Sequence, residues 1–180
     1  MVKRRVTVKK LQCKLWLAFL IALVLGVLLH FLYGWLPNPL TSLISPVCES
    51  LWEHLKILYF PLLLSALILT KGSPSARTAR LLSLLLACGL MLGAAWLYHI
   101  PFRGESLVLD IALYVAAMAL GFVLPRVLWP LGEWPGVTAV VYFLTILLGV
   151  MLVWFTFFPP EGVLFADLSG AVRTFLTIPV

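Results

Sequence analysis

The segment CESLWEHLKILYFP, residues 48–61, concentrates ionisable side chains in a chain that is otherwise strongly apolar. Glu49, Glu53, His54 and Lys56 fall within eight consecutive residues. Carboxylate and imidazole groups exchange protons near neutral pH and bind zinc and related metals. The segment therefore predicts either a reactive site or a set of ion pairs, although it lacks a metal-ligand spacing such as His-Glu-x-x-His.

The other two histidines belong to separate apolar runs. His30 lies near the end of the first run, His99 near the end of the third, and Asp110 near the start of the fourth. We expect a zinc ion bound by His30, His99 and either His54 or Glu53, because three protein ligands with an open position activate water. Asp110 would orient a histidine or act as general base, and Glu53 is the second candidate catalytic group. If the protein is an enzyme, it is then a metal-dependent intramembrane hydrolase of a lipid or an amide.

The composition is that of a membrane protein. Hydrophobic residues make up 63% of the 180 residues and charged residues 11%, whereas soluble domains average about 45–50% apolar and about 25% charged residues. We expect an all-α, polytopic transmembrane helical bundle that forms a single integral membrane domain, residues 1–180. The cysteines have unrelated spacings, which indicate neither a disulfide framework nor a thiolate metal site.

Five apolar runs have the length of about 20 residues that a helix needs to cross a hydrocarbon core of about 30 Å. The expected spans cover residues 15–36, 47–70, 80–100, 107–128 and 137–158. Residues 161–180 repeat apolar side chains at helical spacing but include Asp167 and Arg173. We expect them to form an amphipathic or re-entrant segment at the outer surface, with a short sixth span as the alternative.

Positive charge predicts the orientation. Six cations precede the first apolar run: Lys3, Arg4, Arg5, Lys9, Lys10 and Lys14. By the positive-inside rule the N-terminus is cytoplasmic in the cell (inner or plasma) membrane. This cluster favours contact with anionic lipid of the bilayer and not with nucleic acid. Every histidine and every acidic residue except Glu133 then falls on the extracytoplasmic side.

A polar pocket is therefore expected at the extracytoplasmic end of the bundle. On a continuous helix over residues 47–70, Glu49, Glu53 and Lys56 would share one stripe, and His54 would lie on its flank. The expected inward-facing residues are His30, Glu53, His54, His99 and Asp110, with Glu49, Trp52 and Lys56 also contributing to the pocket.

Two alternatives remain open from the sequence. The ionisable residues could form a proton- or ion-linked relay in a small transporter. They could also be interhelical hydrogen bonds and ion pairs in a structural or accessory membrane protein with no site. A homo-oligomer is compatible with all three interpretations.

The same segment carries a resemblance. Together with the upstream HFLYGW and the downstream FFPPEGVLFADL, it resembles a family of small bacterial multi-span membrane proteins classed only as a domain of unknown function. That family has a Glu-Ser-x-Trp-Glu-His-Leu-Lys signature after its first span, which corresponds here to residues 49–56. The resemblance implies a polytopic bacterial membrane protein and supplies no activity.

Overall fold

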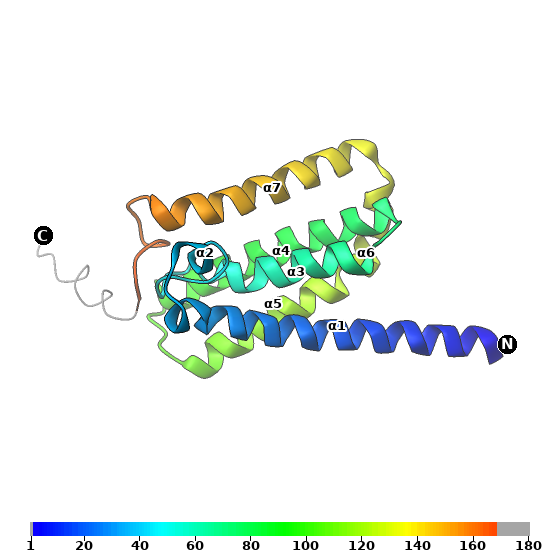
Figure 1. Cartoon of the computed structure of the whole chain (residues 1–180), viewed down its shortest axis with the longest axis horizontal. Helices are drawn as coiled ribbons and strands as arrows, with labels where there is room; N and C mark the ends of the chain where they lie inside the picture. The colour runs from blue at the N-terminus through cyan, green and yellow to red at the C-terminus, as the bar shows by residue number, and fades with distance from the viewer. Residues whose placement is uncertain (1, 169–180) are drawn as a thin grey trace, which may run out of the picture.

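The computed structural model describes residues 2–168, with side chains described from residue 14 onward. Over this range the protein is helical and contains no strands. Its elements are α1 (Val2–Trp35), α2 (Pro39–Ser42), α3 (Leu55–Leu69), α4 (Pro74–His99), α5 (Leu107–Val123), α6 (Pro125–Leu128), the 3₁₀ helix η1 (Trp129–Glu133) and α7 (Pro135–Phe157). The long helices run along one axis, with α2 at one end of the bundle (Figure 1).

Four described segments are long and apolar enough to cross a membrane: Lys14–Trp35, Pro74–His99, Leu107–Glu133 and Pro135–Phe157. They correspond to four of the five expected spans. The apolar helix α3 has only 15 residues, which at about 1.5 Å per residue reach about 22 Å, short of a hydrocarbon core of about 30 Å.

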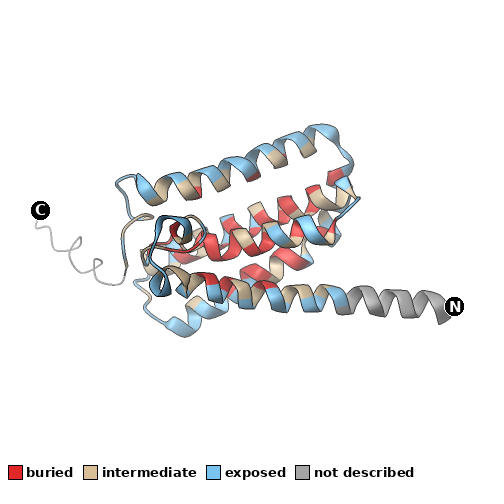
Figure 2. Ribbon diagram, in the orientation of Figure 1, coloured by how far each residue is buried: buried red, intermediate tan, exposed pale blue. Residues whose placement is uncertain are grey.

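Helices α3 and α4 form the centre of the bundle. Leu58 and Ala66 of α3 and Leu84 and Ala87 of α4 are completely buried. Figure 2 shows many buried residues on these two helices, while α7 carries mostly exposed and intermediate residues. The exposed apolar side chains on these helices suit contact with lipid, in agreement with the four segments that are long and apolar enough to cross a membrane.

Gly26 allows α1 to approach both α3 and α5 closely. A Cβ atom at this position would overlap the Ile57 carbonyl oxygen and the Tyr114 hydroxyl group. The Tyr114 hydroxyl donates a hydrogen bond to the Leu23 carbonyl at 3.0 Å. Pro61 lies within α3 and lacks the amide that would otherwise pair with the Ile57 carbonyl. The three helices therefore meet at Gly26, in the last third of α1.

The helix of the second expected span begins at Leu55 and not near residue 47. The predicted stripe of Glu49, Glu53 and Lys56 along one helix is therefore wrong. Residues 43–54 form turns and irregular structure, and α3 begins at Leu55. The Ser45 hydroxyl makes two hydrogen bonds to the backbone of α1. It donates to the Leu29 carbonyl at 2.6 Å and accepts from the Tyr33 amide at 3.0 Å. The Ser50 hydroxyl accepts from the Glu53 amide at 3.2 Å. Such local side-chain bonds compete with helix formation, so residues 49–56 do not lie on one helical face.

Residues 159–168 fold back over this end of the bundle. The Trp52 amide donates to the Leu164 carbonyl at 3.0 Å, and the Leu168 amide donates to the Glu49 carbonyl at 3.0 Å. Residues 161–168 form turns and not a helix, because their backbone bonds to the turns of residues 49–52. The remainder of the predicted amphipathic segment, residues 169–180, lies outside the described residues.

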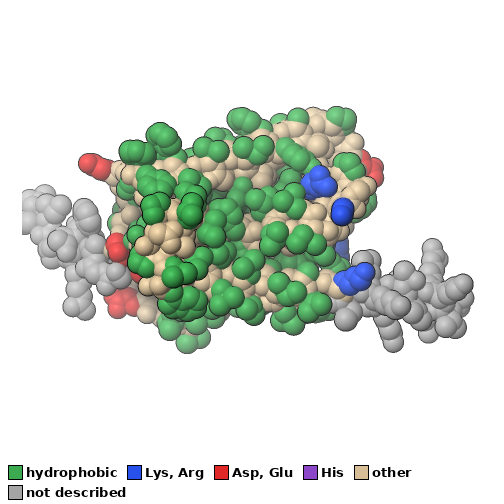
Figure 3. Space-filling model, viewed as in Figure 1, with side chains coloured by type: hydrophobic (Ala, Val, Ile, Leu, Met, Phe, Trp, Pro, Cys, Tyr) green, Lys and Arg blue, Asp and Glu red, His purple; other side chains and the backbone are tan. Residues whose placement is uncertain are grey.

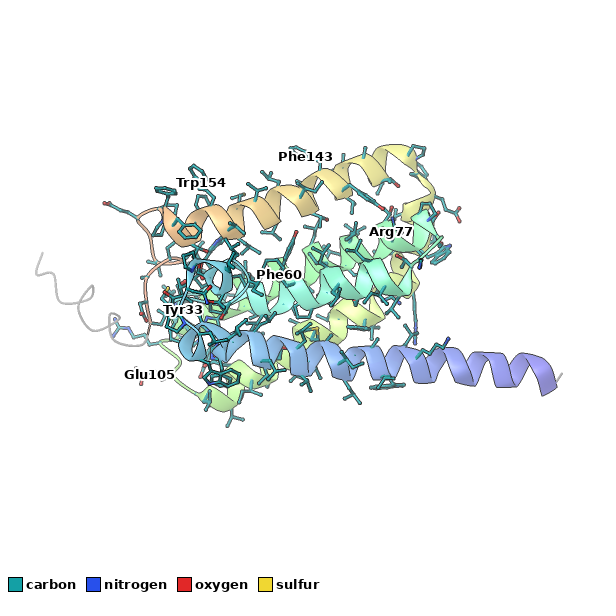
Figure 4. All side chains as sticks on the ribbon, in the orientation of Figure 1. Tyr33, Phe60, Arg77, Glu105, Phe143 and Trp154 are labelled. Carbon is teal, nitrogen blue, oxygen red and sulfur yellow. The ribbon has the colours of Figure 1, made fainter. Side chains whose placement is uncertain are left out.

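Charge divides the two ends of the bundle. In Figure 3 the visible Lys and Arg side chains gather at the end that carries the α3–α4 turn, and most visible Asp and Glu side chains lie at the opposite end. Figure 4 labels Arg77 at the first end and Glu105 at the second. The turns of residues 43–54 therefore lie at the acidic end.

Candidate functional site

His54 lies immediately before α3 and is oriented by the turns that precede it. Its Nδ1 atom lies 2.8 Å from the Ser50 carbonyl oxygen, and its Nε2 atom lies 3.2 Å from Glu49 Oε2. A carbonyl oxygen only accepts hydrogen bonds, so Nδ1 carries the hydrogen. The bond from Nδ1 to the Ser50 carbonyl orients the ring, as such bonds orient ligating imidazoles in metal sites, and the opposite nitrogen, Nε2, faces the Glu49 carboxylate.

His30 of α1 completes a group of three. The His30 and His54 ring centroids are 5.2 Å apart. One ligand atom from each of His30, Glu49 and His54 lies within 4.8 Å of the other two. The His30 Nδ1 atom is buried and has no hydrogen-bond partner. Buried polar atoms are normally paired, so this nitrogen has an unused bonding capacity in a residue that belongs to the group of three.

Glu49 and His54, which both precede α3, stabilise each other's charged forms. The hydrogen bond from His54 lowers the pKa of Glu49, against the opposing effect of burial. Burial by itself lowers the pKa of His54, but the hydrogen bonds to Glu49 and to the Ser50 carbonyl outweigh it and the pKa is raised. The Asp110 carboxylate, which lines the same cavity, also raises the pKa of His54.

His99 and Asp110 form a second histidine–carboxylate pair of similar design. His99 Nδ1 lies 2.9 Å from the Gly104 carbonyl oxygen, and His99 Nε2 lies 2.9 Å from Asp110 Oδ1. The α4–α5 turn supplies the carbonyl, and the first turn of α5 supplies the carboxylate. Both ring nitrogens of His99 are therefore paired, in contrast to those of His30.

Both pairs line one cavity of about 1320 Å³. Its polar lining residues are His30, Glu49, His54, His99, Arg103, Glu105, Asp110 and Tyr114. Its apolar walls come from α1, α4 and α5 and include Val27, Met91, Ala95 and Ile111. The cavity is larger than the usual range of about 300–1,000 Å³ for small-molecule pockets, and its polar groups come from several separate segments of the chain.

Glu53 and Lys56 do not line this cavity, which corrects the expected pocket. Their ion pair is 2.7 Å long, and their side chains are 4% and 0% exposed, respectively. The Lys56 ammonium also lies within hydrogen-bond distance of the Ser42 and Ser45 carbonyl oxygens and of Thr156 Oγ1. Because Leu55 begins the helix, Glu53 precedes it in the turns, and its carboxylate meets α7 and not the histidines.

Trp52 also lies outside the cavity lining. It packs against Phe155 of α7 and Phe165, with ring centroids 5.5 and 5.3 Å away. Of the residues predicted around the pocket, the structure thus brings together His30, Glu49, His54, His99 and Asp110, and it separates Trp52, Glu53 and Lys56. The metal-ligand and catalytic roles assigned from the sequence stay predictions.

Sequence reasoning assigned no role to several residues that build this region. Ser45 ties the turns to α1, Thr156 closes the Glu53–Lys56 network, and Arg103 and Glu105 line the cavity. The available signal was weak: Thr156 is a polar residue in the last turn of an apolar helix, and Arg103 and Glu105 are charged residues in a short outer turn. The partners of Ser45 and Thr156 are distant in sequence, so spacing alone does not identify them.

Comparison with known proteins gives the family. Residues 3–172 match the model of a family of unknown function, DUF6512. No curated protein and no solved structure matches the chain. Since the match covers nearly the whole chain, the protein belongs to the DUF6512 family.

Proposed function

We propose that this DUF6512 protein is an integral membrane protein that binds one divalent metal ion through His30, Glu49 and His54. Zinc is the proposed ion. The observation that carries the proposal is the group of three residues whose ligand atoms lie within 4.8 Å of one another, in which one ring nitrogen of His30 is also buried and unpaired. Two imidazoles and one carboxylate form a ligand set that catalytic zinc sites use.

The surroundings fit a metal centre. The Ser50 carbonyl fixes the hydrogen on His54 Nδ1, which leaves Nε2 for the metal once its proton is released. Three protein ligands leave a coordination position open, and all three residues line the cavity. When bound, the metal would supply Lewis acidity and an activated water in that cavity.

The second histidine–carboxylate pair favours hydrolysis as the activity of such a centre. His99 and Asp110 line the same cavity as the three proposed ligands. Their 2.9 Å contact places a proton-accepting carboxylate and an imidazole together, as general acid–base catalysis requires. In this proposal Asp110 and His99 hold and move the proton, whereas the three ligands position the metal.

The proposed topology places this site on the extracytoplasmic side of the cell membrane. Four described segments qualify as spans by length and composition, and we propose α3 as the fifth, extended to the surface by residues 43–54. Non-helical backbone is tolerated at membrane depth where protein buries it, and Ser45, Ser50, Leu51 and Trp52 are all buried. The basic end would be cytoplasmic under the positive-inside rule, which leaves the histidines on the outer side.

Elemental analysis of protein purified without a histidine tag tests the proposal. The wild type is expected to carry one equivalent of metal, and His30→Ala is expected to carry none. His99→Ala is the matched control, because His99 lines the same cavity but has both nitrogens paired. Metal-free wild-type protein after supplementation with zinc, or equal metal loss from both variants, would contradict the assignment of these ligands.

A second matched pair uses the acidic residues. Glu49→Gln removes a proposed ligand, whereas Glu105→Gln changes an acidic residue that lines the cavity outside the group of three. Only the first substitution should weaken zinc binding in a competition titration with a chelator.

A further inference from the structure

The cavity reaches the outside of the bundle between α1 and α5. Val27 and Phe31 of α1 line it and are 47% and 48% exposed, and Leu107 and Ile111 of α5 line it and are 71% and 54% exposed. These four side chains are apolar and belong to segments long enough to span a membrane. In a bilayer, side chains exposed on these segments contact lipid. The cavity therefore opens laterally into the membrane.

The opening follows from the way the two helices cross. They touch where Gly26 accommodates Tyr114, and the Tyr114 hydroxyl bonds to the Leu23 carbonyl. Toward the acidic end of the bundle, α5 continues away from α1, and its first turns project beyond α1 in Figure 1. The contact at Gly26 therefore closes the inner end of the gap, and the cavity occupies its outer part.

The lining of the cavity is amphipathic. Met91 and Ala95 of α4, 7% and 8% exposed, form part of an apolar wall, and the histidines and carboxylates form the polar part. A volume of about 1320 Å³ accommodates more than a small polar molecule. The matching ligand has a polar head and a long apolar tail.

Arg103 favours a head that carries a phosphate, beside the carboxylates of Glu49, Glu105 and Asp110 in the same lining. It is the one Lys or Arg side chain among the described residues that line the cavity. Its backbone has a φ of 50°, in the left-handed region that side chains with a Cβ atom rarely adopt. Strained conformations of this kind concentrate at ligand sites. Arginine pairs well with phosphate because its planar group donates two parallel hydrogen bonds.

We infer that the cavity holds one phospholipid of the bilayer, which enters between α1 and α5. Its phosphate lies toward Arg103 and the polar wall, and one acyl chain leaves through the gap between Val27 and Ile111. The position of the head group beside a metal ion rests on the proposed function; the sideways entry of the lipid does not.

Photo-crosslinking in lipid nanodiscs tests the inference. The probe is phosphatidylglycerol with a diazirine in one acyl chain, and the labelled residues are mapped by mass spectrometry. Met91 and Ala95 are expected to be labelled although they are buried. Ala87 and Cys88 are the control, because they are also buried on the same helix, at 0% and 2% exposed, but do not line the cavity. Labelling that is absent from Met91 and Ala95 would overturn the inference.

A pair of tryptophan substitutions tests the route of entry. Ile111→Trp narrows the gap, whereas Leu109→Trp adds the same ring at a similarly exposed position of α5 that does not line the cavity. We expect Ile111→Trp to reduce labelling of Met91 at least fivefold and Leu109→Trp to leave it unchanged. Equal labelling of both variants would overturn entry between α1 and α5.

Two further measurements separate this inference from the proposed metal site. Met91 labelled in both wild type and His30→Ala supports the lipid whether or not metal is bound, and metal-loaded protein without labelled Met91 overturns it. Unlabelled phosphatidylglycerol should suppress the labelling, whereas glycerol phosphate at the same concentration should not. Equal suppression by both compounds would identify a soluble anion as the ligand and overturn the lipid.

Discussion

Two clusters of ionisable side chains lie close together in the sequence but differ in how completely their atoms are paired. In the Glu53–Lys56 network both charges are buried, and Thr156 donates to one carboxylate oxygen at 2.9 Å while the Val47 amide donates to the other at 3.1 Å. In the His30–Glu49–His54 group, Glu49 is half exposed and a buried nitrogen of His30 has no partner.

This difference separates a structural role from a binding role. A buried ion pair whose hydrogen bonds are all made fixes the geometry of the segments that it joins, and it offers little bonding capacity to a ligand. The network joins the end of α2 and the turns of residues 43–54 to α3 and α7. The group of three retains capacity at His30 and lies open to a cavity. The network thus holds the turns that present Glu49 and His54, and the group provides the ligands.

The largest expected effect comes from breaking the structural network. Lys56→Met leaves the Glu53 carboxylate buried without its counter-ion, and we expect the free energy of unfolding to fall by about 3–5 kcal/mol. Thermal unfolding in detergent measures the change. Lys71→Met, at an exposed position of the α3–α4 turn, should have almost no effect.

The double variant Glu53→Leu/Lys56→Met sharpens this result. Replacing both charges by apolar groups removes the unpaired carboxylate, so most of the lost stability should return. A double variant as unstable as the single one would mean that the charges themselves, and not their mutual pairing, are needed.

The next-largest expected effect is the increase in the free energy of unfolding when zinc binds. If zinc binds the group of three, zinc at about 100 times its Kd stabilises the wild type by about 2.7 kcal/mol. His30→Leu should unfold at the same temperature with and without zinc. His99→Leu should keep the zinc-dependent increase in Tm, because His99 is not part of the group. A zinc-dependent increase in His30→Leu equal to that of the wild type would break the proposed distinction between the two clusters.

The sequence predicted the helical membrane architecture but not the division between the two clusters. Long apolar runs indicate helices through composition, and four of them appear as candidate spans with ends shifted by several residues. The start of α3 was wrong because the Ser45 hydroxyl bonds to α1 across 16 residues of sequence. Because residues 49–54 are not helical, a helical wheel does not give the directions of the Glu49 and Glu53 side chains.

Glycine positions illustrate the same limit. Small residues at Gly26 of α1 and at Gly89 and Gly93 of α4 are equally typical of closely packed membrane helices. Among the described residues, a Cβ atom would meet the neighbouring helices at Gly26 and open space at the other two positions. Residue type predicts that close packing is permitted, and the positions of Ile57 and Tyr114 decide where it occurs.

A substitution at Ser45 should have a smaller effect on stability and should also affect zinc binding. Ser45→Ala removes the hydroxyl that joins the turns to the Leu29 and Tyr33 backbone groups of α1. We expect the free energy of unfolding to fall by about 1–3 kcal/mol, because buried partners lose their hydrogen bonds. Zinc affinity should fall as well, since α1 carries His30 and the turns carry Glu49. Ser42→Ala is the control, because the Ser42 hydroxyl bonds only locally to Pro39, and unchanged zinc affinity in Ser45→Ala would show that the clusters act independently.

The smallest expected change in stability provides the most direct comparison, since one substitution can be made at both acids. Glu49→Gln alters a half-exposed ion pair, so the metal-free protein should lose at most about 1 kcal/mol of stability. Zinc affinity should nevertheless fall steeply, because an amide is a much poorer ligand for zinc than a carboxylate. Glu53→Gln should give the opposite result, a large loss of stability with zinc binding retained by the folded fraction, because its carboxylate pairs with buried Lys56 and lies outside the cavity. Chelator competition and thermal unfolding on the two variants measure both quantities. If both glutamines changed stability and zinc affinity in the same proportion, the pairing of buried atoms would not distinguish a structural cluster from a binding one in this fold.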